Sequence, residues 1–415
     1  MNRMTISHRA KIVTAVITCL ALLMSTFLTV GTADESYASS KTIKPKITVS
    51  RNKVTVKWNK LPGSYRYTVQ GKLYHSKKLK NLKTTKKTSY TFRTKYEVLY
   101  SVKILAKKGN RTIASKVISF DTGSSSKADA DRVVALPTMK SGIDRIDAID
   151  FVGDDIWYLK STSGTKTYLT LSCVKNATKR KGTYSATASK QYYIKNENGT
   201  KYKGDHGCSM AYVGGYFYIL ANDMDYPILK VSKTGVIKSK IKTSGFLSTQ
   251  TPISAISYYG KDADGNLQFI CRDGRQKTES GTSAYQKFSV GTLKGDTLTR
   301  NFTYLTTDKV SLKTRCNDIY YDPSTTKLYR TMFNYDSDGK SITKSRVKVY
   351  TLSSSTDESG SYRDLDCDKT VNVYLYKHNT TNDRFEVEGV SMYNGKLYLG
   401  INNHPIQDGL YRAKI

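Results

Sequence analysis

One pattern of two short strands recurs five times in this chain, and this repeat limits the fold more than any other feature. Each copy has an alternating strand, a turn that contains Gly, Asp or Asn, and a second strand rich in aromatic residues. The copies begin at Asp144, Asp205, Thr251, Thr314 and Arg384. A period of this length indicates one structural unit that buries its apolar face against the next copy.

Further candidate strands follow each copy, so the unit is longer than a hairpin. The third strands are TYLTLSCV, YPILKVS, YQKFSVGTL, RVKVYTL and GLYRAKI, and the candidate fourth strands are KQYYIKN, TRNFTYLT and VNVYLYKHN. An alignment on the central apolar residues puts Ile149, Met210, Ile256, Ile319 and Val390 in register. Their spacing is typical of four-stranded blades with variable loops.

We therefore predict an all-β chain in which residues 132–415 form a β-propeller with five blades. Residues 132–137, RVVALP, are expected to close the ring against the last blade. Beyond the N-terminal apolar run, the chain has no long segment with helical periodicity. An array of β-sandwiches is the alternative fold.

The last copy carries two glutamates, Glu386 and Glu388, although the whole chain has only seven Glu. In a propeller the first strand of each blade is innermost, and alternate side chains of a strand share one face. The row of Glu386 contains Arg145, His206, Pro252 and Arg315, and the row of Glu388 contains Asp147, Cys208, Ser254 and Asn317. These rows predict a polar ring around the axis, whose candidate ligand-binding residues are Arg145, Asp147, His206, Arg315, Asn317, Glu386 and Glu388.

Two interpretations of this ring stay open. It could be a buried ion-pair network that keeps the blades in register. It could also be a ligand site at the channel mouth, because Arg, His, carboxylate and Asn side chains suit a sugar or an anionic group. Hydrolysis needs two carboxyls on opposite sides of a bond. Glu386 and Glu388 are expected on one strand face, roughly 7 Å apart, which disfavours that role. His206 with Asp147 or Glu388 is a further acid–base possibility.

Residues 41–122 read as a separate small β-sandwich. Six segments alternate as strands do, and they are ITVS, KVTVKW, YRYTVQG, SYTF, YSVKILAK and SKVISF. The early strand that ends at Trp58, the Tyr-rich next strand and the Y-x-V-x-I-x-A strand before a Gly-Asn turn resemble a fibronectin type III domain. This resemblance implies a spacer or a ligand-binding sandwich. Residues 123–131 are small and polar and are predicted to be a linker.

The net charge of +33 is concentrated in the predicted sandwich. Residues 41–123 hold 22 Lys and Arg against two acidic residues, which gives +20. The most basic stretch lies between predicted strands, and its candidate polyanion-binding residues are Lys77, Lys78, Lys80, Lys83, Lys86 and Lys87. A solvated surface is one interpretation. A binding surface for an anionic polymer is the other, with a cell-wall polyanion or an extracellular glycan as the partner and nucleic acid bound only non-specifically.

The N-terminus is typical of a secretory signal. Three basic residues precede an apolar run, and small residues follow, with cleavage expected near residue 33 or 38 and residues 1–38 as the signal peptide. A retained membrane anchor is the alternative; after cleavage no other segment is apolar enough to span a bilayer. We therefore expect a secreted or surface-associated protein, and a monomer.

The sequence contains none of the common cofactor or metal motifs. There is no Cys-x-x-Cys pair, nucleotide-binding glycine loop or zinc-protease signature, so we expect no cofactor and no metal. Two Asp-rich segments before Gly, KDADGN and YDSDGK, fit hairpin turns because the distal Glu of a calcium loop is missing. Five cysteines would follow the cleavage site, and their pairing is left open.

The strands HGCSMAY and FEVEGVSMYNGKLYLGIN resemble those of secreted Gram-positive propellers, including helveticin-like class III bacteriocins. The resemblance rests on His206, Gly207, Met210 and Tyr212 and on Glu386, Glu388 and the hairpin at 393–395. The family pattern has Asn where this chain has Cys208. It implies a protein that acts on bacterial surfaces. We therefore predict a non-catalytic, surface-binding protein with a ligand site at the propeller axis; an extracellular polysaccharide hydrolase or lyase is the alternative.

Overall fold

The computed structural model describes most of the chain beyond its N-terminal segment. The described residues are 42–63, 65–73, 76, 78–96, 98–122, 129–136, 145–161, 168–179, 189–204, 207–221, 225, 227–246, 253–277, 283–311, 314–315, 317–335, 342–356, 362–373, 384–404 and 408–414. The predicted signal peptide and most of the predicted linker lie outside these residues. Among the described residues, no helix is long and apolar enough to cross a membrane.

The N-terminal region forms two antiparallel sheets. The first contains β1 (Lys46–Ser50), β2 (Lys53–Lys57) and β5 (Ser89–Arg93), and the second contains β4 (Lys80–Thr85), β3 (Arg66–Leu73), β6 (Leu99–Lys108) and β7 (Arg111–Asp121). Aromatic rings join the sheets: the ring centroids of Trp58 and Tyr67 are 5.4 Å apart, and those of Phe92 and Tyr100 are 5.7 Å apart. Burial of these rings and of the aliphatic residues around them stabilises the pair of sheets.

Strand β4 lies in the basic stretch that was predicted to connect two strands, so this part of the prediction is wrong. β4 pairs with β3 at the edge of the four-stranded sheet. Most of its side chains are exposed, and it lacks the alternation of apolar residues that marks a strand with one buried face. Its backbone pairing therefore could not be recognised from the side chains.

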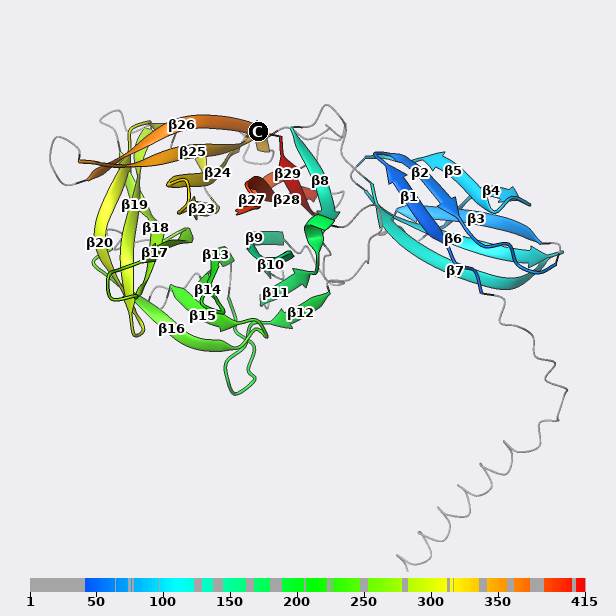
Figure 1. Ribbon diagram of the computed structural model, residues 1–415, viewed down its shortest axis with the longest axis horizontal. Coiled ribbons are helices and arrows are strands. Elements are labelled where there is room, and N and C mark those ends of the chain that lie inside the picture. The colour runs from blue at the N-terminus through cyan, green and yellow to red at the C-terminus, as the bar shows by residue number, and fades with distance from the viewer. Residues whose placement is uncertain are drawn as a thin grey trace, which may run out of the picture. The chain divides into compact units, whose positions relative to one another are not determined.

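The remaining strands form five four-stranded units (Figure 1). Unit 1 contains β9 (Arg145–Val152), β10 (Asp155–Ser161), β11 (Leu169–Val174) and β12 (Lys190–Tyr193). Unit 2 contains β13 (Gly207–Val213), β14 (Tyr216–Ala221), β15 (Ile228–Ser232) and β16 (Ile237–Ser244). Unit 3 contains β17 (Ile256–Lys261), β18 (Leu267–Lys277), β19 (Ser283–Lys294) and β20 (Thr297–Thr306), with the short β21 (Val310–Ser311) beside β19.

Units 4 and 5 complete the series. Unit 4 contains β22 (Thr314–Arg315) and β23 (Ile319–Asp322), which both pair with β24 (Lys327–Tyr335), followed by β25 (Ile342–Thr356) and β26 (Arg363–Val373). Unit 5 contains β27 (Arg384–Tyr393), β28 (Lys396–His404), β29 (Gly409–Ala413) and β8 (Ala130–Ala135). The pairing of β8 with β29 confirms the predicted closure of the last unit by an N-terminal strand.

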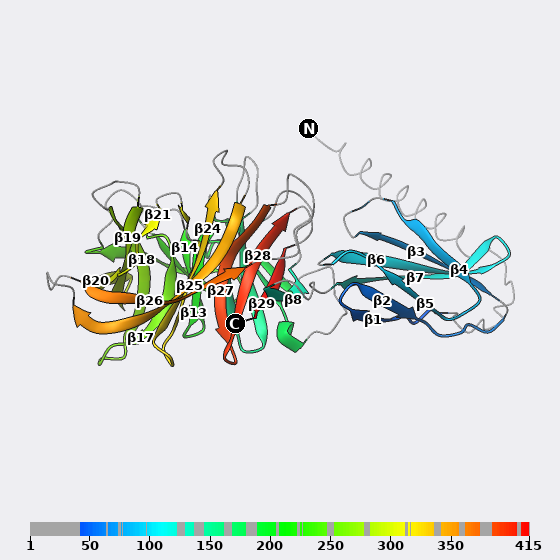
Figure 2. The ribbon, with the colours of Figure 1, turned by 90° about the horizontal axis from the view of Figure 1, so that it is seen from above.

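The first strands of the units contact one another in a closed ring. β9 contacts β27 and β13, β17 contacts β13 and β23, and β23 contacts β27. Figure 1 shows these strands innermost, and Figure 2 shows the same units from the side. The all-β prediction is confirmed, since the described residues hold only one short 3₁₀ turn, η1 (Ala177–Lys179), besides strands. Five four-stranded units in a ring agree with the predicted blades, and the propeller assignment itself stays a prediction.

Each apolar core of the ring lies between two neighbouring units. The core between units 1 and 2, for example, joins Trp157 and Leu171 to Phe217 and Leu229. Equivalent cores occur at the other four junctions. The outer strands of units 2, 3 and 4 also pair in parallel, through β16 with β20 and β20 with β26. These pairings cover outer edges that would otherwise be free to bind another strand.

Candidate functional site

The two glutamates lie at the beginning of β27 and are buried in the ring. Glu386 is 5% exposed and Glu388 is 6% exposed. A register shift between Val387 and Gly389 interrupts the alternation of β27, which is the mark of a β-bulge. The carboxyl groups of Glu386 and Glu388 are hydrogen bonded to each other. They are therefore in direct contact, which the spacing of an unbroken strand did not predict.

The amide side chains of Asn402, on β28, and of Asn317, just before β23, complete the environment of Glu388. Its Oε1 atom accepts a hydrogen bond of 3.2 Å from Asn402 Nδ2, and its Oε2 atom accepts one from Asn317 Nδ2. Asn402 also accepts from the backbone amide of Ile146 and donates to its carbonyl oxygen, at 2.8 and 3.1 Å. This cluster therefore links unit 5 to units 4 and 1.

The protonation of Glu388 is perturbed by this environment. Burial raises the pKa of its carboxyl well above the usual range, and the hydrogen bond and charge of Glu386 raise it further. Asp147, 2% exposed, adds a third carboxyl to the cluster, and its Oδ1 atom accepts a hydrogen bond of 3.3 Å from Ser161. Neighbouring carboxyls disfavour one another's ionisation, so the charges of Glu386 and Asp147 add to the rise in the pKa of Glu388.

The structure brings four of the seven predicted ligand-binding residues together, namely Asp147, Asn317, Glu386 and Glu388. Arg145 and Arg315 belong to the described strands β9 and β22, but their side chains lie outside the described part of the structure, and so does all of His206. The predicted contacts between the glutamates and these three basic residues stay predictions.

A second polar layer at the axis was missed by the sequence analysis. Asp318, which is fully buried, accepts hydrogen bonds from the Ser209 hydroxyl and from the Val390 amide, the latter at 3.1 Å. The Ser209 hydroxyl also contacts the Ile256 amide and carbonyl at 3.0 and 3.1 Å. Units 2, 3, 4 and 5 thus meet at one carboxyl and one hydroxyl.

Asp150 links the first strands in the same way, one layer further along. Its Oδ2 atom accepts a hydrogen bond of 2.7 Å from the Tyr212 amide, and its Oδ1 atom accepts one of 2.9 Å from the Ser391 hydroxyl. Ser257 Oγ accepts a hydrogen bond from the Tyr321 amide between units 3 and 4. Burial raises the pKa of Asp150 to about 6 and raises that of Asp318 above its usual range.

A sequence signal for this layer exists. Asp150 directly follows Ile149, and Asp318 directly precedes Ile319, so each acid stands beside the apolar row on which the units were aligned. An acidic residue next to a core position of a central strand is unusual. The sequence analysis followed only the rows of Glu386 and Glu388, and it therefore assigned no role to Asp150 and Asp318.

Five of the six predicted polyanion-binding lysines lie on or beside β4. Lys80 and Lys83 are exposed on the strand, and Lys86 and Lys87 are exposed in the turn to β5. Lys78 is exposed just before β4, whereas Lys77 lies outside the described residues. Lysine on an edge strand also prevents pairing with other chains, so their presence on β4 has a structural explanation as well.

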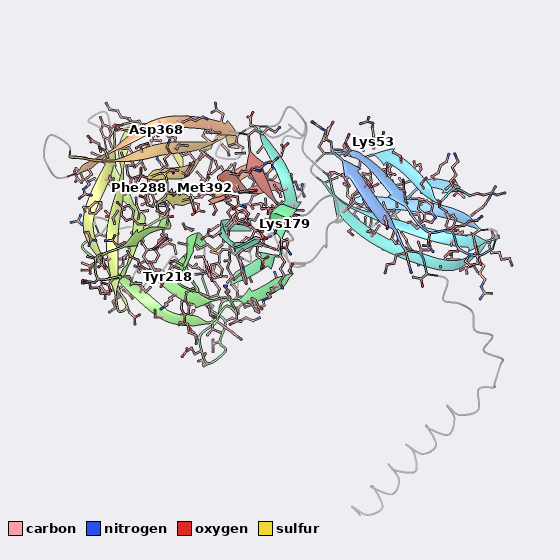
Figure 3. The ribbon with its side chains drawn as sticks, in the orientation of Figure 1. Lys53, Lys179, Tyr218, Phe288, Asp368 and Met392 are labelled. Atoms are coloured by element: carbon pink, nitrogen blue, oxygen red, sulfur yellow. The ribbon has the colours of Figure 1, made fainter. Side chains whose placement is uncertain are left out.

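A second basic surface covers the outer side of the sheet β1-β2-β5. Lys46 stands directly opposite Lys57, and Lys53 stands directly opposite Arg93. These four side chains are exposed, and Lys53 is labelled in Figure 3. A row of threonines, Thr48, Thr55 and Thr91, separates the two pairs. We call this surface the cationic face.

Metal and thiol chemistry receives no support from the described residues. They contain no group of three or more His, Cys, Asp or Glu that could hold a metal ion. In the KDADGN segment the Asp262 carboxylate accepts hydrogen bonds from the Asp264 and Asn266 amides, at 3.0 and 2.8 Å, as predicted for a turn. Among the described residues, Cys271 and Cys367 are free thiols, and Cys271 is buried.

No protein-family model and no curated protein matches this chain. Among solved structures, the tail fibre of Staphylococcus aureus phage P68 is 12% identical with a TM-score of 0.40, over 69% of this chain and 52% of the fibre. The endosialidase of phage phi92 is 13% identical with a TM-score of 0.31, over 93% of this chain and 60% of the enzyme. The N-terminal domain of Nup159 is 10% identical with a TM-score of 0.27, over 89% and 87%. The chain spans about half the length of the tail fibre, and at these TM-scores none of the likenesses assigns a function.

Proposed function

We propose that this chain is a secreted, non-catalytic protein that binds anionic polymers or glycans of a bacterial surface through its basic sandwich. The sandwich is a fibronectin type III-like tether in this proposal. The observation that carries it is the cationic face, where Lys46 faces Lys57 and Lys53 faces Arg93 in one three-stranded sheet. Like charges directly opposite each other destabilise a sheet. Their presence therefore points to a use outside the sheet.

The geometry of the cationic face suits an extended polyanion. Lys53 and Lys57 are four residues apart on β2, so the two charged pairs are separated by about 13 Å along the strands. The threonine hydroxyls between them offer hydrogen-bond partners, and the face holds no carboxylate. A chain of phosphate groups laid across the sheet would place negative charge against both pairs and would relieve their repulsion.

The carboxyl pair in the ring gives no support to the hydrolase alternative. Glycosidases hold their two carboxyls about 5 to 10 Å apart, on either side of the bond that breaks. The carboxyls of Glu386 and Glu388 are instead hydrogen bonded to each other, and both residues are buried. Their cluster also connects three units of the ring, as expected of a hydrogen-bond network that stabilises the fold. We therefore place polymer binding on the sandwich.

The test is binding of the purified chain to Gram-positive cell walls, with and without teichoic acid, across a salt series. One variant removes the four charges of the cationic face by changing Lys46, Lys53, Lys57 and Arg93 to Gln. The matched control removes four charges beside β4 by changing Lys80, Lys83, Lys86 and Lys87 to Gln. We expect binding that needs teichoic acid, weakens steadily with salt, and falls at least about tenfold more in the first variant than in the second.

The remaining outcomes are equally informative. Binding that does not depend on teichoic acid or on salt would overturn the proposal. A larger loss in the control would move the binding surface to β4, and equal losses would mean that the charge of the whole sandwich acts without a defined face. Release of soluble sugar during the incubation would support the hydrolase alternative.

A further inference from the structure

The ring has a pocket at the end opposite the glutamate cluster. It lies between the β23–β24 turn of unit 4 and the β27–β28 turn of unit 5, and it encloses about 390 Å³. Glu386 lies near the start of β27 and Tyr393 ends it, so the pocket and the cluster are separated by roughly 20 Å along the strand. The pocket is therefore a site distinct from the glutamate cluster, and the hairpin at 393–395 forms part of its lining.

Aromatic side chains form one wall of the pocket. Tyr320, Tyr329 and Tyr393 line it together with Met392, which is labelled in Figure 3. The ring centroids of Tyr320 and Tyr329 are 6.5 Å apart, with 50° between the ring planes. This separation leaves no room for a group between the two rings, so a ligand would lie against the faces that they present to the pocket.

Tyr393 is held in position by two contacts from unit 1. Its ring stacks on Phe151 at 4.8 Å with an angle of 18°, and its hydroxyl donates a hydrogen bond to Asp154. A ring that is fixed in this way loses little conformational freedom when a ligand stacks on it. The aromatic wall is therefore formed before any ligand arrives.

The polar part of the pocket comes from the two turns. Asp322 accepts hydrogen bonds from the Ser324 hydroxyl at 2.7 Å and from the Thr325 hydroxyl at 2.8 Å, which fixes its carboxylate. Asn394 is in a left-handed conformation, with φ of 49°, and is followed by Gly395, as expected for a tight hairpin turn. Carboxylate, amide and hydroxyl groups thus surround a site with an aromatic wall.

The charge of the lining selects against anions. Asp322 is charged, whereas the other lining residues are Tyr, Met, Ser, Thr, Asn and Gly, with neither Lys nor Arg among them. A pocket of a few hundred cubic ångströms with aromatic walls and a few fixed polar groups is suited to a small polar ligand with apolar faces. A sugar ring has this character, because its C–H faces stack on aromatic rings and its hydroxyls bond to carboxylates and amides.

We propose that this pocket binds one or two residues of a neutral saccharide, which stacks on the tyrosine wall and donates hydroxyl protons to Asp322 and Asn394. This goes beyond the proposed function, because it concerns another site, an uncharged ligand and a different part of the chain. A protein with both sites would attach to a wall polyanion through the sandwich and would recognise a neutral sugar through the ring.

The experiment is saturation-transfer NMR on the purified chain with glucose, galactose and N-acetylglucosamine and their disaccharides, and with sialic acid and glucose 6-phosphate as anionic probes. Salt at about 0.5 M screens the attraction between exposed charges and leaves stacking and hydrogen bonding in place. The result is therefore independent of polymer binding by the sandwich, and either proposal can fail alone.

Two variants and one control locate the contact. Asn394→Gly removes the side chain and keeps a residue that tolerates the left-handed backbone, and Tyr393→Leu removes the stacking face. Tyr212→Leu is the matched control, because Tyr212 lies one residue before the end of the first strand of unit 2 and also packs on a Phe ring, at 4.9 Å. We expect a neutral sugar to bind, with affinity lowered at least about tenfold by each pocket variant and unchanged in the control.

Several results would overturn the proposal. These are no binding of any neutral sugar, preference for the anionic probes, or equal affinity in both pocket variants and the wild type. Loss of binding in Tyr212→Leu as well would place the contact elsewhere in the ring. Circular dichroism of each variant shows whether the fold is retained, and Asn394→Gly alone is sufficient for the test if Tyr393→Leu does not fold.

Discussion

Ser209 and Asp318 are hydrogen bonded across the axis of the ring, although their units are not neighbours. Ser209 lies on β13 of unit 2, Asp318 directly precedes β23 of unit 4, and unit 3 stands between them. A direct side-chain contact between these units means that the ring is closed at this level. Any ligand site on the axis must therefore lie toward one of its two ends.

The Ser209 hydroxyl connects three units through its hydrogen bonds. It accepts from the Ile256 amide, and its single proton lies within reach of both the Asp318 carboxyl and the Ile256 carbonyl oxygen. Burial raises the pKa of Asp318 above its usual range, and the hydrogen bonds from Ser209 and Val390 oppose that rise.

Replacement of Asp318 tests this network through stability. Asp318→Ala leaves the Val390 amide and the Ser209 hydroxyl without their partner in the interior, and each buried unsatisfied group costs about 1 to 3 kcal/mol. We expect a decrease of about 2 to 4 kcal/mol in the free energy of unfolding, measured by urea denaturation. Asp318→Asn keeps an oxygen at this position that can accept from the Val390 amide or the Ser209 hydroxyl, so it should cost less than half as much.

The control for this prediction is Asp264→Ala. Asp264 lies in an exposed turn, where substitutions change stability by no more than about 0.5 kcal/mol. Equal effects of Asp318→Ala and Asp264→Ala would show that the contact across the axis contributes nothing. A larger cost for Asp318→Asn than for Asp318→Ala would show that the carboxyl is ionised.

Stability should fall as the pH rises through the titration of Asp150. Burial raises the pKa of this group from 3.8 to about 6, so the folded state binds a proton that the unfolded state releases earlier. The associated stability is fully present below about pH 4 and is lost as the pH rises through about 6. A shift of two units corresponds to about 3 kcal/mol. Urea midpoints between pH 4 and pH 8 measure this loss.

The variant Asp150→Asn separates this effect from the general charge of the protein. A chain with a net charge of +33 gains further positive charge in acid, which destabilises it as a whole. That contribution is the same in the wild type and in Asp150→Asn, so it cancels in the difference between their free energies of unfolding. As the pH rises from 4 to 7, this difference should shift so that the variant becomes more stable relative to the wild type. A difference that is constant with pH would contradict the assigned titration.

The strand order could be predicted because apolar residues alternate along most strands. Each predicted third strand overlaps a strand of the structure. YPILKVS contains β15 and GLYRAKI contains β29, whereas β19 and β25 extend beyond the predicted YQKFSVGTL and RVKVYTL. The predicted strand VNVYLYKHN overlaps β26 only at residues 371–373, so most of β26 was not predicted, and neither was the short β21. The other strands that were missed, β4 and β16, are outer strands with several lysines. In β16 only Ile237 and Ile241 are buried, four residues apart, so no alternation marks it.

The contacts of the site could be predicted only in part. The register shift in β27 lies between Glu386 and Gly389, and a shift of one residue changes the face to which side chains point. No property of the letters FEVEGV reveals that shift. The sequence therefore identified Glu386, Glu388, Asp147 and Asn317 as members of one polar cluster, but it placed the two glutamates apart from each other.

Glu388→Gln distinguishes a structural cluster from a ligand site on the axis. The Gln side chain can still accept a hydrogen bond from Asn402, and it can donate one to Asn317 if the Asn317 amide rotates by 180°. The substitution also removes a buried carboxyl that is costly to ionise. We expect little change in stability at pH 5, higher stability than the wild type at pH 8, and unchanged wall binding. Binding that survives high salt and is lost in a folded Glu388→Gln variant would instead place a ligand site at the axis.

Gly389→Ala should be strongly destabilising because β27 and β9 approach each other closely at this residue. A Cβ atom on Gly389 would lie 2.7 Å from the Ile149 backbone nitrogen, and backbone cannot move aside as the end of a side chain can. We expect the free energy of unfolding, measured by urea denaturation, to fall by at least about 2 kcal/mol.

Gly260→Ala is the matched control, since Gly260 is also a strand glycine of the ring and a Cβ atom there would meet nothing within 4 Å. It should be neutral or slightly stabilising, because Ala restricts the unfolded chain more than Gly does. If both variants lose the same stability, the close approach of the first strands does not limit the choice of residue at 389.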